Sequence, residues 1–133
     1  MLTENDVVDA VARHLQRNGW RIECTSSTHE RSHDILATKG ETTLAIEAKG
    51  ETSSDPGSSR FGKPFDSGQK RSHVAVALYK AACVFSATRY RPAIALPATD
   101  RHLTLIEAAR AALEKLHVTV FLVDDDRTVR EWP

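Results

Sequence analysis

Two carboxylates and an amine lie in a short stretch that otherwise has the pattern of a β-hairpin. Asp34 precedes the apolar run ILA, and Glu47 and Lys49 interrupt the run TTLAIEAK. Carboxylate oxygens bind hard cations at about 2.0–2.6 Å. A nearby ammonium neutralises negative charge that develops on a phosphoryl group. These residue types at this spacing therefore indicate metal-assisted phosphate chemistry.

The hairpin pattern predicts that these side chains share one face. The second run alternates, so Glu47 and Lys49 lie on the face opposite its apolar residues. A two-residue turn at Lys39-Gly40 places Asp34 opposite Ala45 and on that same face. Asp34 and Glu47 are then diagonal neighbours, roughly 7 Å apart at Cβ. An exposed hairpin face explains each residue alone, but the three together favour a site.

Length and composition limit the class of protein. The 133 residues, 41% hydrophobic and 27% charged, predict one globular domain spanning 1–133. The first fifteen residues lack the apolar core of a secretory signal, and no apolar run reaches the roughly 18 residues of a membrane helix. Two unpatterned cysteines, Cys24 and Cys83, fit a reducing compartment. We therefore expect a cytoplasmic protein with no membrane partner.

The formal charge is zero overall but unevenly distributed. Residues 1–55 carry a net −4, residues 56–91 a net +6 and residues 92–133 a net −2. Such a basic segment is either a solvated face or a phosphate-binding patch, and composition alone weighs the two equally. If it binds nucleic acid, the candidate contacts are Arg60, Lys63, Lys70 and Arg71.

The elements around the hairpin are predicted from period and capping residues. A helix from about Glu4 to Asn18 has Thr3 as its N-cap, and Glu4 lies at the edge of its apolar stripe. That carboxylate either complements the helix dipole or contributes to the site. A strand at 20–25 and a Ser/Thr-rich loop lead into the hairpin, and residues 50–68 form a long, mobile loop able to close over a polymer.

A second helix begins near Asp66 or Ser67 and is apolar on most sides. Its Gln69 either completes a capping box with Asp66 or points toward the hairpin's polar face. A strand at 91–98, a helix at 102–116 and a buried strand at 117–123 follow. The order α-β-β-β-α-β-α-β predicts an α/β fold with a mixed sheet flanked by helices.

This pattern resembles the PD-(D/E)XK nuclease superfamily, and within it the small Holliday-junction-resolvase-like and restriction-endonuclease-like members. The resemblance covers the whole chain. It rests on Glu4 in the first helix, Asp34 on the second strand, Glu47-Ala48-Lys49 on the third and Gln69 opening the next helix. Two departures are His33, where the family name has Pro, and the neutral overall charge.

The resemblance implies a divalent-metal-dependent endonuclease that hydrolyses DNA, with branched DNA as one candidate substrate. Asp34, Glu47 and the Ala48 carbonyl would hold Mg²⁺ or Mn²⁺. Lys49 would act on the attacking water and the transition state. Glu4 would support a water or second metal, and Gln69 would position water or phosphate.

Other interpretations stay open at this point. The fold serves in other proteins as a catalytically silent DNA-binding or complex-forming subunit, and RNA is an alternative substrate. The family's small resolvases act as two-fold dimers, so a homodimer is a further candidate partner. The surfaces for it are a stripe of Val76, Tyr79 and Cys83 on the second helix, or the strand near 118–123. Equally, the stripe could pack inside its own chain.

Overall fold

The protein is a mixed sheet flanked by helices, as the sequence predicted, and the sheet has six strands instead of the predicted five. The structure, a computed structural model, describes residues 1–25, 33–53 and 55–133. The elements in chain order are α1 (Glu4–Arg17), β1 (Arg21–Thr25), β2 (Ile35–Lys39), β3 (Thr42–Ala48), α2 (Ser67–Ala87), β4 (Arg91–Pro97), α3 (Asp100–Ala108), α4 (Arg110–Lys115), β5 (Thr119–Val123) and β6 (Val129–Glu131). The predicted Ser/Thr-rich loop after β1 lies largely outside the described residues.

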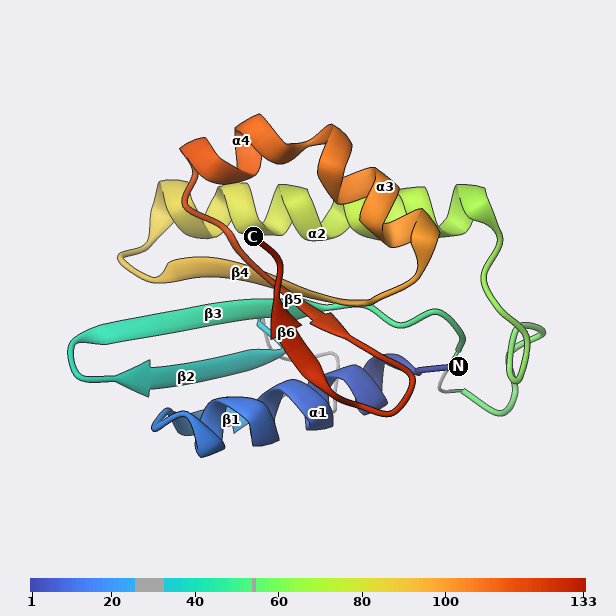
Figure 1. Cartoon of the computed structure of the whole chain (residues 1–133), viewed down its shortest axis with the longest axis horizontal. Helices are drawn as coiled ribbons and strands as arrows, with labels where there is room; N and C mark the ends of the chain where they lie inside the picture. Colours follow the sequence, from blue (N-terminus) through green and yellow to red (C-terminus); the bar gives the residue numbers. More distant parts are fainter. Residues whose placement is uncertain (26–32, 54) are drawn as a thin grey trace.

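The six strands lie side by side in sequence order. The pairs β1–β2, β2–β3 and β5–β6 are antiparallel, whereas β3–β4 and β4–β5 are parallel. The two parallel pairs are joined by helices, as parallel connections require. The helix α1 covers one face and α2, α3 and α4 cover the other (Figure 1).

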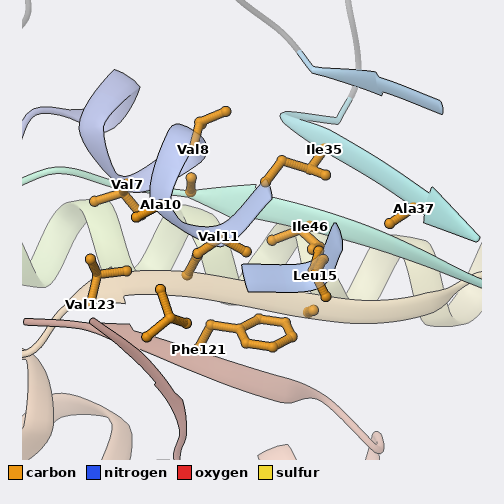
Figure 2. Close-up of a cluster of buried hydrophobic side chains, with 14 of the residues drawn as sticks. Val7, Val8, Ala10, Val11, Leu15, Ile35, Ala37, Ile46, Phe121 and Val123 are labelled. Carbon is orange, nitrogen blue, oxygen red and sulfur yellow. The ribbon is translucent and has the colours of Figure 1, made fainter. Parts of the chain in front are cut away.

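Each face of the sheet has its own hydrophobic cluster. On the α1 side, Val7, Val11 and Leu15 pack against Ile46 and Phe121, and Figure 2 shows this cluster. On the other side, Val74, Ala77 and Ala81 of α2 lie against alternate residues of β4 and β5. Because β4 is covered on both faces, every residue from Pro92 to Pro97 is buried.

The C-terminal third differs from the sequence prediction in two places. The predicted third helix is divided at Ala109 into α3 and α4. A short strand, β6, pairs antiparallel with β5 after a turn in which Arg127 has a positive φ of 69°. The strand near 118–123 is therefore interior to the sheet, so the prediction that it forms a dimer surface is wrong. Three residues of β6 carry little periodicity, which explains why the pattern missed it.

Candidate active site

The hairpin places Asp34 next to Glu47, in a register two residues away from the predicted one. Ile35 lies opposite Ile46, and the turn is Gly40-Glu41 rather than Lys39-Gly40. Gly40 has a φ of +60° and takes the first position of the turn, where a two-residue loop of this kind needs a positive φ. Since strand side chains repeat every two residues, a shift of two keeps Asp34 on the predicted face.

The backbone connects Asp34 directly to the end of β3. Its N–H donates to the Ile46 carbonyl at 3.0 Å, one step before β2 begins. Its carboxylate Oδ2 accepts the Ala48 N–H at 2.8 Å. Extending the observed register by one step puts Asp34 opposite Glu47, so the two carboxylates are direct neighbours instead of diagonal ones.

Glu47 is a buried carboxylate that forms ion pairs with two ammonium groups. The side chain is 8% exposed, and its Oε1 lies 3.4 Å from Lys49 Nζ and 3.0 Å from Lys80 Nζ. The sequence prediction included Lys49 but not Lys80, which comes from the middle of α2. The sequence contained one indication of this role, because Lys80 is the sole charged residue between His73 and Arg89.

Glu4 reaches the same site because the start of α1 is fixed against the end of β3. Leu2 N–H donates to Glu51 Oε1 at 2.8 Å, and Glu51 N–H donates to the Leu2 carbonyl at 2.8 Å. Gly50 has no side chain, and a Cβ there would come within 2.4 Å of Glu4 N and 2.6 Å of Thr3 C. This close approach sets Glu4 beside the carboxylates and Lys49.

The electrostatics of the cluster follow from burial and like charge. Burial raises the pKa of Asp34 to about 7, and the negative charges of Glu47 and Glu4 add to the rise, while the Ala48 N–H and Lys49 oppose it. Burial likewise raises the pKa of Glu4, against the lowering effect of Lys49. The hydrogen bond to Glu47 raises the pKa of Lys80. A cation added here would relieve this repulsion.

The donor set suits a small, hard divalent cation. Asp34 uses Oδ2 and Glu47 uses Oε1 in the contacts given above, and Glu4 lies within hydrogen-bond reach of Asp34, so three carboxylates together offer oxygen ligands to an ion. Within residues 1–25, 33–53 and 55–133, no group of three or more His, Cys, Asp or Glu side chains is arranged to hold a metal ion by itself. Mg²⁺ commonly binds through one or two carboxylates and completes its shell with water and phosphate, and this arrangement offers those ligands.

Gln69 takes the capping role rather than facing the hairpin. Its Oε1 accepts the Asp66 N–H at 2.9 Å, and its own N–H donates to Asp66 Oδ1 at 2.8 Å. These two bonds form the capping box of α2. Of the two alternatives for Gln69, the structure shows the cap.

The four basic candidates lie on the loop and on the first turns of α2. Arg60 pairs with Asp66 at 3.4 Å and is half-buried, whereas Lys63 and Arg71 are exposed and Lys70 is half-buried. The Thr52 hydroxyl lies 2.9 Å from the Arg60 carbonyl and 2.6 Å from the Lys63 carbonyl, which anchors the loop near its base. The loop's predicted mobility stays a prediction.

An open cavity of about 280 Å³ lies between this loop and the side chains of Glu4 and Lys49. It lies on the side of Glu4 and Lys49 that faces the loop, so a ligand there contacts both. Its lining residues are Glu4, Lys49, Gly50, Thr52, Ser53, Asp55, Phe65 and His73. Burial lowers the pKa of His73, and Lys49 lowers it further, which favours a neutral imidazole at this wall.

Comparison with known proteins supports the fold. The chain is similar to the FdxN element excision controlling factor protein from Anabaena variabilis, with a TM-score of 0.56 and 18% sequence identity over 96% of this chain and 98% of that one. At this identity the likeness concerns the fold alone. No protein-family model and no curated protein matches the sequence. No helix within the described ranges has the length and apolar character needed to cross a bilayer.

Proposed function

We propose that this chain is a divalent-metal-dependent endonuclease that hydrolyses phosphodiester bonds in DNA, with branched DNA among its candidate substrates. The observation that carries the proposal is the convergence of Asp34, Glu47 and Lys49 at the C-terminal end of β3, with Glu4 brought there by α1. The structural neighbour, named as a factor that controls excision of an element, supports the fold alone.

Each residue then has a role set by its position. Asp34, Glu47 and the Ala48 carbonyl would hold Mg²⁺ or Mn²⁺, which supplies positive charge and Lewis acidity to the phosphate. Lys49 would orient the attacking water and stabilise charge on the phosphoryl oxygens. Glu4 would hold a water or a second cation. In the reaction, water adds to phosphorus, one P–O ester bond breaks, and the departing oxygen takes a proton.

The test is cleavage with and without metal. Plasmid, a four-way junction, a flap, single-stranded DNA and RNA are each incubated with Mg²⁺ or Mn²⁺, beside EDTA controls. We expect cleavage that EDTA abolishes, and a loss of orders of magnitude in Glu47→Gln and Lys49→Ala. Cleavage by wild type in EDTA would refute the proposal. DNA binding without cleavage in any metal would instead identify a catalytically silent binding subunit, and cleavage of RNA alone an RNA nuclease.

The basic residues are proposed to contact the phosphate backbone. Arg60→Ala combined with Lys63→Ala should weaken DNA binding without regard to sequence, because such contacts release counterions instead of reading bases. The slope of log K against log salt should become shallower by about 2. An anisotropy titration at several salt concentrations measures both quantities. An unchanged affinity and slope would show that the segment is only a solvated face.

A further inference from the structure

Lys80 stands between the buried Glu47 and solvent. Its side chain is 47% exposed, whereas that of Glu47 is 8% exposed and that of Lys49 is 17% exposed. The Lys80 ammonium lies 3.0 Å from Glu47 Oε1, closer than that of Lys49 at 3.4 Å. An anion that approaches Glu47 from the α2 side therefore meets the Lys80 ammonium first.

The two lysines open toward different cavities. Lys49 lines the cavity of about 280 Å³ on the loop side, together with Glu4 and His73. Lys80 lines a second, open cavity of about 420 Å³, which is largely apolar. The residues around this second cavity are His33, Lys80, Cys83, Val84, Ala87 and Thr88. Nucleic acid bound at the site would thus meet one ammonium group from each cavity.

The net charge of the site indicates a role for Lys80 beyond neutralising Glu47. With all groups ionised, the three carboxylates and two ammonium groups of the site carry a net −1. A bound divalent cation changes this to +1, which attracts a phosphodiester of charge −1. Without Lys80 the metal-loaded site would be neutral, and the attraction for phosphate would be lost.

We propose that Lys80 is a phosphate-binding residue on the α2 side of the site. It pairs with Glu47 in the metal-free protein, and it binds a backbone phosphate of the nucleic acid once a divalent cation shares Glu47. The inference rests on the proposed function, since it needs both the metal and the nucleic acid. It adds to that function a second ammonium that contacts substrate away from Lys49.

The test compares Lys80→Met with Lys80→Arg, and uses Lys115→Met, an exposed lysine of α4, as the matched control. Calorimetry with Mn²⁺ alone measures metal binding, and anisotropy with labelled DNA in Ca²⁺ measures nucleic-acid binding. We expect Lys80→Met to bind Mn²⁺ about fivefold more tightly, because a competing cation has been removed. DNA affinity should fall about tenfold with a salt slope shallower by about 1, and Lys80→Arg should restore both.

Two results would overturn the inference. If Lys80→Met weakens Mn²⁺ binding and leaves DNA affinity unchanged, Lys80 only holds Glu47 in place. If wild type cleaves DNA and Lys80→Met matches it in affinity, salt slope and kcat/KM, the inference fails while the nuclease stands. If wild type shows no cleavage but Lys80→Met still loses DNA affinity and salt slope, the phosphate contact is supported and the nuclease proposal fails.

Discussion

At the scale of single residues, Asp34 and Glu47 have opposite electrostatic situations although they are neighbours. Glu47 is paired with two ammonium groups. Asp34 accepts one backbone N–H, but burial and then the negative charges of Glu47 and Glu4 disfavour its charged form. A site arranged for a cation is expected to be strained in this way when the cation is absent. The difference gives a prediction that needs no activity assay.

We predict that Asp34→Asn raises the stability of the metal-free protein and that Glu47→Gln lowers it. An amide at position 34 still accepts the Ala48 N–H but removes a repelling charge, whereas an amide at 47 leaves Lys49 without its counter-ion. Thermal melts in EDTA should show Asp34→Asn about 5 °C above wild type and Glu47→Gln below it. Asp125→Asn, at an exposed site, should match wild type. A lower melting temperature for Asp34→Asn would contradict this account.

Addition of Mn²⁺ extends the same measurement. It should raise the melting temperature of wild type, because a ligand that binds only the folded state stabilises it. It should leave both variants unchanged, since each lacks one of the two carboxylates. An equal shift in all three proteins would place the metal elsewhere.

His102 should make stability depend on pH. It is fully buried, its Nδ1 lies 2.7 Å from the Thr99 hydroxyl, and its Nε2 has no hydrogen-bond partner among the described residues. Burial, with Lys70 and His73 nearby, lowers its pKa to about 4 from 6.5. The unfolded chain therefore binds the proton more readily between these values. This histidine's contribution is present above pH 6.5, and about 3 kcal/mol is lost as the pH falls to 4.

Urea unfolding of wild type and His102→Leu at pH 7.5, 6.0 and 5.0 checks this. The variant should lose less stability on acidification than wild type, because leucine has no proton to bind. The difference between the two proteins isolates this residue from the other titrating groups. Parallel pH profiles would show that His102 binds its proton equally well in the folded and unfolded states.

At the scale of elements, the site depends on how α1 meets the end of β3. The backbone of residues 2–3 runs beside residues 51–52, linked by the Leu2–Glu51 hydrogen bonds and a parallel bridge between Thr3 and Thr52. Gly50 lies where the two segments are closest. The start of the helix thereby places Glu4 at a site formed by strand residues that are 30 or more positions away in the sequence.

Gly50→Ala should separate α1 from β3. The added methyl would meet backbone atoms of Leu2, Thr3 and Glu4 at 3.0 Å or less, and backbone cannot move aside as a side chain can. We expect a loss of about 2 kcal/mol in unfolding free energy, measured by urea denaturation, together with loss of cleavage. Gly57→Ala is the control, because its Cβ would meet only the Asp55 side chain. Equal stability of the two variants would refute the close-contact explanation.

At the scale of the whole molecule, α2 presents an apolar stripe to solvent. Val76 is 45% exposed and Tyr79 is 71% exposed, and Cys83 is also exposed, while Val74, Ala77 and Ala81 face the sheet. Of the two sequence-based alternatives, packing of the stripe inside its own chain is wrong. The homodimer stays a prediction: if the proposed nuclease makes paired incisions, it needs two sites.

The dimer prediction is tested by light scattering at micromolar concentration. Wild type should have the mass of two chains and Tyr79→Glu the mass of one, because a charge at the centre of an apolar interface is costly to bury. Phe61→Glu, which changes an exposed aromatic on the loop, should stay dimeric. Wild type with the mass of one chain, and nicking without paired incision, would remove the dimer.

The sequence by itself determined what local periodicity and capping encode. Alternation placed Asp34, Glu47 and Lys49 on one face, and this survived the change of turn because the strand period is two. Thr3 and Asp66 marked the starts of α1 and α2, since each cap forms within four residues. The fold class followed from the order of these elements.

Only the tertiary structure determined the contacts between elements that are far apart in the sequence. The pairing of Lys80 with Glu47 joins residues 33 apart and requires the packing angle of α2 on the sheet. The contact of Gly50 with the start of α1 likewise arises from packing between distant segments. The turn shifted by one position because only Gly40 tolerates the positive φ that the first turn residue needs. Local sequence patterns specify which face of a strand a side chain occupies and where a helix begins. Which residue of another element contacts that side chain is specified by how the whole chain packs.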